Sequence, residues 1–366
     1  MNILDIDHIE FYVGDAVAAA RSMSTAYGFR AFGQGGPETG LAGQRTVLLG
    51  QGGVRVLLTS GLREDHPASQ FVARHGDGVA VIAFRADDAE AAYAAIVAAG
   101  GTGLQPPRAW ENDGALVTTA EVAGFGDVVY RLTERRGGDG EFQPGAITMD
   151  PAAARGSGED LLRLVDHAAL VVPAGDLEPV VAFHERVLGL SVVFEEYVVV
   201  GRQAMFSKVV QSPSGGVTFT ILEPDLSRPS GQIDDFLSWH GGAGVQHLAF
   251  LTDDIVRAVR TFEAQGAEFA VTPASYYDML AARLGETEIP ADDLRPCGVL
   301  VDRDHWGQMY QIFAKSTHIR RTYFHELIDR RGARTFGMSN IPALYEAKER
   351  ELAGTQAAPV TTGRRR

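Results

Sequence analysis

The feature that most constrains the fold of this chain is an internal repeat. Residues 5–13 alternate between polar and apolar types as a strand does, and they contain His8; a similar strand containing His167 opens far downstream. An acidic residue, a helical stretch and a glycine follow each strand at the same spacing. These bounding residues, which predict helix N-caps and C-terminal glycines, are Asp15 and Gly28 in the first copy and Asp176 and Gly189 in the second.

The repeat continues through the second half of each copy. Residues 75–84 match 241–250, and each segment leads into an acidic pair and an amphipathic helix. Each copy ends with a strand and a basic turn, at residues 130–137 and 323–332. Because the period is about 160 to 195 residues, we expect two tandem domains of the same architecture. The pattern predicts an α+β fold in which each domain contains two strand–helix–three-strand (βαβββ) units.

The composition of the intervening segments sets the predicted domain bounds. We expect an N-terminal structural domain over residues 1–136, a linker over 137–159 that is rich in Gly, Ala, Pro and Asp, and a C-terminal domain over 160–353. Only the second copy adds a C-terminal helix, with Pro342 near its first turn and Ser339 or Asn340 as its cap. The small, polar and finally basic tail over 354–366 is predicted to be disordered.

Bulk properties exclude several classes of function. The chain of 366 residues has a formal net charge of −14, which argues against nucleic acid and against an anionic membrane surface as partners. No apolar run has the roughly 18 residues of a membrane-spanning helix, and the N-terminus lacks the pattern of a secretory signal. Cys297 is the single cysteine, so no internal disulfide can form. These properties predict a cytoplasmic enzyme or binding protein.

The positions at which the two copies differ indicate where the chemistry lies. His8 and His167 coincide, but His247 falls on Val81 and Glu326 falls on Arg131. The second copy therefore offers two histidines and a carboxylate, the set that holds non-haem Fe(II) on one face and leaves other positions open.

Each of these residues also has an ordinary structural interpretation. His247 could be a core histidine with satisfied hydrogen bonds, His167 could form a polar pair with its neighbour Asp166, and Glu326 could face solvent from its strand. The remaining histidines outside the repeat strands, which are His66, His75, His184, His240, His305 and His318, are expected on the surface.

Several motifs make the chain resemble the 4-hydroxyphenylpyruvate dioxygenase family, which has the vicinal-oxygen-chelate fold. The resemblance covers about residues 5–351. Its most specific motifs lie at 231–234 (Gly-Gln-Ile-Asp), 244–247 (Gly-Val-Gln-His), 275–278 (Ser-Tyr-Tyr-Asp) and 311–313 (Gln-Ile-Phe). It implies open, barrel-like sheets, a C-terminal gating helix, and Fe(II) held by His167, His247 and Glu326. It further implies 4-hydroxyphenylpyruvate and O2 as substrates, and it leaves a homodimer open.

Two stretches bear on the branch of the family. The dioxygenases, which make homogentisate, usually read Phe-Pro-Ile-Asn-Glu-Pro where this chain has Phe-Thr-Ile-Leu-Glu-Pro at 219–224, and Gly-Asn-Phe where it has Ser-Asn-Ile at 339–341. Both departures resemble the other branch, the 4-hydroxymandelate synthases, which serve the biosynthesis of aryl-glycine peptide natural products. Homogentisate formation in tyrosine catabolism is the alternative, and a non-catalytic small-molecule binder is a third.

The resemblance also implies roles for residues around the metal. Phe313 and Phe336 are expected to hold the substrate ring between them, and Leu222 and Ile341 to select the product, with Gln311 beside them in the catalytic group. The expected substrate-binding residues are Ser207, Thr220, Gln232, Gln246 and Tyr345. For the polar members of this set, ordinary strand polarity is the alternative.

Overall fold

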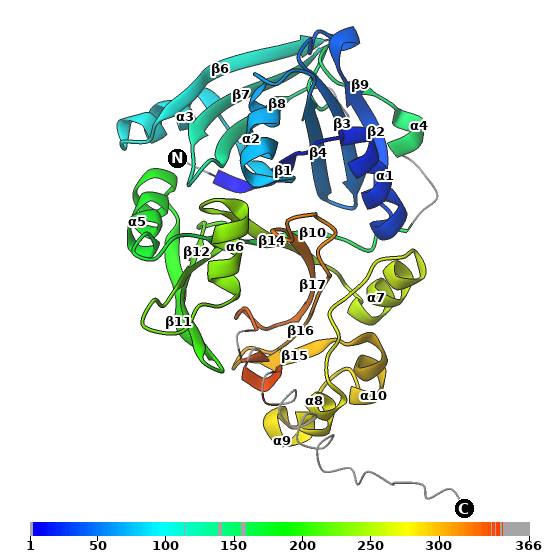
Figure 1. The fold of residues 1–366 in the computed structure, drawn as a ribbon. Coiled ribbons are helices and arrows are strands. Elements are labelled where there is room, and N and C mark those ends of the chain that lie inside the picture. Colours follow the sequence, from blue (N-terminus) through cyan, green and yellow to red (C-terminus); the bar gives the residue numbers. More distant parts are fainter. Residues whose placement is uncertain are drawn as a thin grey trace, which may run out of the picture.

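The computed structural model describes residues 3–112, 114–137, 141–154, 159–337, 339–340, 342–344 and 346. These residues form two curled sheets with helices around them, one domain above the other in Figure 1. The N-terminal sheet has the strand order β6-β7-β8-β5-β1-β4-β3-β2-β9, and the C-terminal sheet has the order β11-β12-β13-β10-β14-β17-β16-β15.

The strands of the N-terminal sheet are β1 (Ile3–Tyr12), β2 (Arg30–Gly35), β3 (Gln44–Gln51), β4 (Val54–Gly61), β5 (Gly78–Ala86), β6 (Gly103–Asn112), β7 (Ala115–Ala123), β8 (Val129–Arg136) and β9 (Thr148–Met149). Those of the C-terminal sheet are β10 (Leu164–Val171), β11 (Ser191–Val200), β12 (Gln203–Gln211), β13 (Thr218–Pro224), β14 (Gly244–Leu251), β15 (Leu300–Arg303), β16 (Gln308–Phe313) and β17 (Phe324–Arg331). The helices are α1 (Ala16–Tyr27), α2 (Pro67–His75), α3 (Ala89–Ala98), α4 (Pro151–Ala154), α5 (Leu177–Leu188), α6 (Gln232–His240), α7 (Ile255–Ala264), α8 (Ala274–Asp278), α9 (Leu280–Leu284) and α10 (Ala291–Leu294), with short 3-10 turns at Pro37–Thr39 and Arg295–Cys297. Among the described residues, no helix is long and apolar enough to cross a membrane.

The predicted α+β architecture of two tandem domains is confirmed. Each domain contains two βαβββ units, namely β1-α1-β2-β3-β4 and β5-α3-β6-β7-β8 in the first domain, and β10-α5-β11-β12-β13 and β14-α7-β15-β16-β17 in the second. In each domain the first strands of the two units pair antiparallel, and each also pairs in parallel with the last strand of its own unit. Each sheet is thus curled into a half-barrel around this central pair.

Local sequence accounts for the helix ends. Asp15 accepts hydrogen bonds from the backbone N–H groups of Val17 and Ala18 at 2.9 and 3.0 Å, and Gly28 closes α1 in the left-handed conformation at φ 70°. The cap of α5 differs from this pattern, because the side chain of Asp176 makes no capping bond. There the carboxylate of Glu223 accepts from the backbone at the start of the helix instead.

The strand registers show that the two domains are superimposable at the predicted positions. His8 lies opposite Ala83, which pairs with Arg131; in the second domain His167 lies opposite Ala249, which pairs with Glu326. The second domain has an additional segment between α7 and β15, which contains α8, α9 and α10, whereas α3 of the first domain leads directly to β6. This segment explains why the repeat period increases along the chain.

Part of the segment predicted as a linker belongs to the N-terminal sheet. Strand β9 pairs with β2, with Met149 opposite Gly33, and Phe142 and Ile147 are buried against the same edge. The polar composition of this segment gave no sign of the strand, which is only two residues long.

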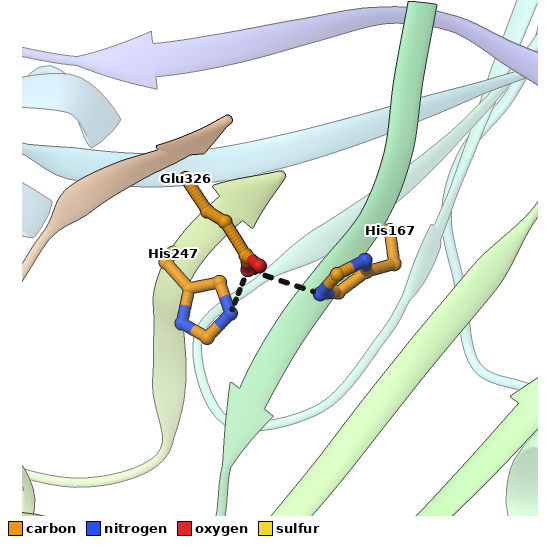
Figure 2. Close-up of side chains that lie close together, drawn as sticks. All are labelled: His167, His247 and Glu326. Atoms are coloured by element: carbon orange, nitrogen blue, oxygen red, sulfur yellow. Dashed lines mark ion pairs between the residues drawn. The ribbon is translucent and has the colours of Figure 1, made fainter. Parts of the chain in front are cut away.

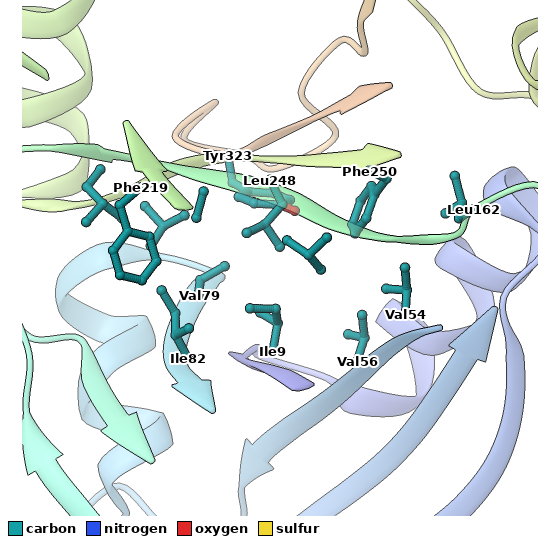
Figure 3. Close-up of a cluster of buried hydrophobic side chains, with 14 of the residues drawn as sticks. Ile9, Val54, Val56, Val79, Ile82, Leu162, Phe219, Leu248, Phe250 and Tyr323 are labelled. Carbon is teal, nitrogen blue, oxygen red and sulfur yellow. The ribbon is translucent and has the colours of Figure 1, made fainter. Parts of the chain in front are cut away.

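A shared hydrophobic core joins the two domains. Ile9, Val56 and Ile82 extend from the N-terminal sheet toward Leu248 and Phe250 of the C-terminal sheet, and all five side chains are buried in one continuous cluster (Figure 3). One face of each sheet is therefore covered by the other domain.

Three histidines that were expected on the surface are buried instead, which corrects that prediction. The His75 and His240 rings stack at 4.3 Å between α2 and α6, and His184 Nε2 lies 2.6 Å from the Tyr130 hydroxyl of the other domain. Burial lowers the pKa of His184 to about 4, so the neutral ring donates from Nδ1 to the Val180 carbonyl and accepts from Tyr130. Their burial depends on docking of the two domains, which sequence periodicity does not report.

The predicted C-terminal helix is described only in part. Residues 340, 342–344 and 346 are helical. Ile341 and Tyr345 lie outside the described residues, as does the tail predicted over 354–366.

Candidate metal centre and active site

Three neighbouring strands bring His167, His247 and Glu326 together (Figure 2). They come from β10, β14 and β17, and their ligand atoms all lie within 4.8 Å of one another. Glu326 Oε2 is 3.4 Å from His167 Nε2 and 3.3 Å from His247 Nε2. Glu326 is 2% exposed and so does not face solvent, and the two imidazoles point at its carboxylate rather than at core partners.

A carboxylate–arginine pair fixes the orientation of His167. Asp166 Oδ1 accepts a hydrogen bond from His167 Nδ1 at 2.8 Å, and the Arg330 guanidinium holds both oxygens of Asp166 at 2.7 and 2.8 Å. This leaves Nε2 of His167 directed at the shared site, which is the arrangement expected of a metal-ligating histidine. The corresponding contact of His247 is weaker, with Gln246 Oε1 at 3.4 Å from its Nδ1.

The same contacts set the protonation of the three groups. Burial acts to lower the pKa of His167, but its hydrogen bonds to Asp166 and Glu326 outweigh burial and raise the pKa to about 9. His247 has one carboxylate partner, so burial dominates and its pKa is lowered. Burial acts to raise the pKa of Glu326, yet the two imidazoles hold it below its usual range.

The donor set fits a divalent cation. It supplies two imidazole nitrogens and a carboxylate, and no lysine or arginine forms an ion pair with Glu326 among the described residues. A buried carboxylate without a fixed cation of its own is costly unless a positive charge accompanies it. Protons on the histidines or a bound metal ion can provide that charge.

A cavity of about 300 Å³ adjoins the three residues, a size within the usual range of small-molecule sites. Seven of the residues predicted to act on substrate line it, namely Thr220, Leu222, Gln232, Gln246, Gln311, Phe313 and Phe336. The ring of Phe336 meets His167 edge-on at 5.2 Å, and that of Phe313 meets His247 at 6.1 Å. The two phenylalanines thus border the site next to different histidines.

Gln311 and Gly337 are in close contact at the cavity wall. Gln311 is 1% exposed, and its Oε1 has no hydrogen-bond partner among the described residues. A side chain at position 337 would meet that oxygen at 1.9 Å, and the backbone there has φ 69°, so both space and conformation require glycine. The amide of Gln311 is therefore held at the cavity wall with hydrogen-bonding capacity to spare.

One predicted substrate residue lies elsewhere, and two other predicted site residues fall outside the described part of the chain. Ser207 is buried but is not among the residues that line this cavity; it lines a separate pocket with Lys208 and Glu178. Ile341 and Tyr345 lie outside the described residues, although Leu344 from the same helix lines the cavity.

Sequence reasoning missed several residues of the site. Met205, Ile233 and Phe324 also line the cavity, and the ring of Phe324 stacks on His247 at 4.9 Å. It also missed the Asp166–Arg330 pair, although an Asp-His dipeptide opens both copies of the repeat and could have revealed it.

In the N-terminal domain, a guanidinium occupies the place that corresponds to Glu326. Arg131 Nη1 lies 2.7 Å from Glu10 Oε2 and 3.2 Å from His8 Nε2, and Nη2 lies 2.8 Å from Glu121. Asp7 holds His8 Nδ1 at 2.6 Å, as Asp166 holds His167. This domain thus repeats the supporting contacts and replaces the ligand set with an internal ion pair.

Comparisons with known proteins agree with the repeat. Profiles described as the Glyoxalase/Bleomycin resistance protein/Dioxygenase superfamily match residues 7–118 and 164–294. The chain is 31% identical to 4-hydroxyphenylpyruvate dioxygenase from Yarrowia lipolytica, over 95% of this chain and 92% of that protein. It is 30% identical to the enzyme of the same name from Dictyostelium discoideum, over 94% and 97%.

Among solved structures, the chain is similar to a triple mutant of 4-hydroxymandelate synthase from Streptomyces coelicolor. The identity is 40% and the TM-score 0.86, covering 96% of this chain and 100% of that one. With both kinds of relative matched over nearly their whole length, the chain belongs to the 4-hydroxyphenylpyruvate dioxygenase and 4-hydroxymandelate synthase family of non-haem iron dioxygenases.

Proposed function

We propose that this protein is a 4-hydroxymandelate synthase, which converts 4-hydroxyphenylpyruvate and O2 to 4-hydroxymandelate and CO2. The observation that carries the proposal is the apolar side chain of Leu222 in the wall of the cavity, at the position where the dioxygenase pattern has asparagine. The 40% identity to a 4-hydroxymandelate synthase over the whole chain supports the same branch.

The proposed metal is Fe(II), held by His167, His247 and Glu326. Two nitrogens and one carboxylate suit this ion and leave positions open for substrate. When bound there, iron supplies the site at which the 2-oxo acid and O2 are activated. The protein contributes fixed ligands, with Asp166 and Arg330 holding His167 in place.

The cavity walls have the properties needed to orient an aromatic 2-oxo acid. Phe313 and Phe336 provide flat apolar surfaces beside the two histidines, which can align the substrate ring at little entropic cost. Gln311 lines the cavity, and its side-chain amide can form a hydrogen bond with the substrate's phenol. The apolar lining also keeps water away from the reacting carbon.

The branch depends on which carbon of the substrate lies nearest the oxidising centre. Attack at the benzylic carbon gives hydroxymandelate, and attack at the ring leads to homogentisate. Because about 1.4 kcal/mol changes a rate tenfold, a difference of about 2 to 3 kcal/mol between the barriers gives nearly one product. One side chain can supply that difference. Leu222 offers no hydrogen bond that would hold the ring in the position for ring attack.

Homogentisate formation is the second candidate, because the curated relatives at about 31% identity are named 4-hydroxyphenylpyruvate dioxygenases. The two candidates differ in product and share every other requirement. A binding protein without catalysis is less well supported, since such a protein has no need of three converging ligands.

The test is to incubate the purified protein with Fe(II), ascorbate, O2 and 4-hydroxyphenylpyruvate and to identify the products by chromatography. We expect mainly 4-hydroxymandelate from the wild type, and a shift toward ring-derived products in Leu222→Asn, alone and with Ile341→Phe. Mainly homogentisate from the wild type would refute the branch. An unchanged product ratio in both variants would remove these two residues from the explanation and leave the branch standing.

A further inference from the structure

A second, larger cavity lies between the two domains. It is a cleft of about 950 Å³ bordered by β1 and the start of β4 on one side, and by β10, β11 and the segment after β17 on the other. Phe336 lines both this cleft and the catalytic cavity, so its side chain forms part of the wall between them. Asp166 and Arg330, which hold His167, also line the cleft.

The carboxylates that line the cleft already have partners. Asp5 pairs with Arg85 at 2.5 Å, Asp7 with Arg135 at 2.7 Å, and Asp166 with Arg330 at 2.7 Å. Asp304 accepts hydrogen bonds from the backbone N–H groups of Trp306, Gly307, Arg334 and Thr335. The negative charges of the cleft are therefore neutralised or hydrogen-bonded within the protein.

Two of the arginines that line the cleft have no such partner. The Arg55 and Arg334 guanidiniums form no ion pair with a carboxylate among the described residues, and both side chains are exposed. Arg163 pairs with Asp253 at 3.2 Å, but both side chains are more than half exposed, so water screens the pair. The lining contains four arginines and four aspartates, so its formal charge is balanced, and the charge of Arg55 also acts on Asp5. Arg55 and Arg334 are the guanidiniums of the lining that no carboxylate of the described residues binds directly, so they can pair with an anion.

The cleft also has aromatic and apolar walls. Trp306 is 48% exposed, and the Arg334 guanidinium lies 4.9 Å from the centre of its ring. Val193, which is 51% exposed, and Phe194 line the same space. A ligand with a flat ring and a carboxylate would match an indole, an apolar wall and two guanidiniums.

We propose that this cleft is a second binding site, distinct from the catalytic cavity, for small aryl carboxylates. Arg55 and Arg334 bind the carboxylate, and Trp306 and Phe194 pack against the ring. The choice of an aryl acid as ligand rests on the proposed function, because that activity uses and makes acids of this class. The site itself rests on the charges and walls of the cleft.

The test uses a protein in which Trp306 is the sole tryptophan, made by Trp110→Phe and Trp239→Phe and checked for folding by circular dichroism. The probe is 4-hydroxyphenylacetate, added to the metal-free protein while tryptophan emission is recorded. We expect saturable quenching with a single dissociation constant. The matched probe 4-methylphenol, which lacks the carboxylate, should bind at least about tenfold more weakly, a loss of about 1.4 kcal/mol.

Arginine variants decide whether the cleft holds the probe. Arg55→Gln and Arg334→Gln should each raise the dissociation constant at least about tenfold. Arg21→Gln, an exposed arginine on α1 away from the cleft, should leave it unchanged. Quenching that does not saturate, or equal constants in all three variants, would overturn the proposal. Calorimetry on variants that keep all three tryptophans gives the same comparison if the reporter protein does not fold.

Because no turnover is measured, failure of the cleft and failure of the proposed function can be told apart. A protein that makes homogentisate can still bind the probe between its domains. Conversely, a hydroxymandelate synthase whose Trp306 emission does not respond would refute the cleft alone.

Discussion

The two domains share the contacts that hold their strand histidines but differ in the charge of the central residue. In both, an aspartate orients a strand histidine and an arginine holds that aspartate. In the N-terminal domain the central cation is the guanidinium of Arg131, paired with Glu10 and Glu121. In the C-terminal domain the corresponding residue is Glu326, and two histidines face it. The first site has its cation within the chain, whereas the second takes positive charge from solution, either as protons on its histidines or as a metal ion.

The largest effect should come from removing one ligand on either side of this comparison. We expect His247→Ala to abolish turnover and to lower iron affinity by more than about 100-fold, since the loss of a ligand exceeds the usual effect of an outer contact. Circular dichroism should show the fold intact. Metal analysis of the purified variant and its product assay check the expectation.

His8→Ala is the matched variant in the other domain. It should keep one iron per chain and lose about 1 to 3 kcal/mol of unfolding free energy, because Asp7 and Arg131 lose a buried hydrogen-bond partner. If His8→Ala loses iron to the same extent as His247→Ala, the contrast between the domains is wrong.

The next prediction concerns the stability that Arg131 gives to the N-terminal domain, at the place that corresponds to the metal centre. Arg131→Met leaves Glu10 buried without its positive partner, and breaking such a pair costs about 3 to 5 kcal/mol. Urea denaturation of the variant should show that loss, with iron stoichiometry unchanged. The exposed pair of Arg85 with Asp5 provides the control, and Arg85→Met should cost less than about 1 kcal/mol. If the two variants lose the same free energy of unfolding, the buried pair of Arg131 with Glu10 stabilises the protein no more than an exposed pair does.

The smallest effect concerns pH and the raised pKa of His167. Below about pH 9, the metal-free protein holds a proton on this ring that a metal must displace, because only the neutral imidazole can ligate. Iron affinity should therefore rise by about tenfold per pH unit through neutral pH and level off as pH passes about 9, with one proton released per metal bound. Anaerobic calorimetry in buffers of different ionisation enthalpy counts that proton.

Variants of the two aspartates sharpen this prediction. Asp166→Asn removes the hydrogen bond that most strongly stabilises the protonated His167 ring, so iron affinity should stop rising at a lower pH. The maximal iron affinity should also fall by about 10- to 100-fold. Asp7→Asn, at the corresponding place in the N-terminal domain, should leave the curve unchanged. An unaltered curve in Asp166→Asn would show that the pair does not control His167.

The strand pattern and the repeat were sufficient to predict the architecture and to single out the three converging residues. Side chains that occupy the same register position in two copies of one sheet occupy the same place in space, so His247 against Val81 and Glu326 against Arg131 marked the divergent site. The sequence could not show which other strand residues reach the cavity. That depends on the curl of the sheet, which brings Met205 and Phe324 to the wall and leaves Ser207 beside a different pocket.

Burial between the domains was also beyond the reach of sequence. His75, His184 and His240 lie on helices whose local pattern looks polar, and each is buried at the contact with the other domain. The partners that satisfy them, such as the Tyr130 hydroxyl, are far away in the chain. Periodicity describes one element at a time and so carries no information about such contacts.

The N-terminal domain has a structural role, because it shares a hydrophobic core with the C-terminal domain. Residues of this core include Ile9, Val56, Ile82, Leu248 and Phe250. Removal of the residues before 160 would expose the hydrophobic face of the C-terminal domain to water. Exposed hydrophobic surfaces of this kind favour aggregation. The N-terminal half therefore stabilises the C-terminal half by keeping this surface out of water. It does so without a metal site of its own, because the contact between the halves uses apolar side chains and not ligands.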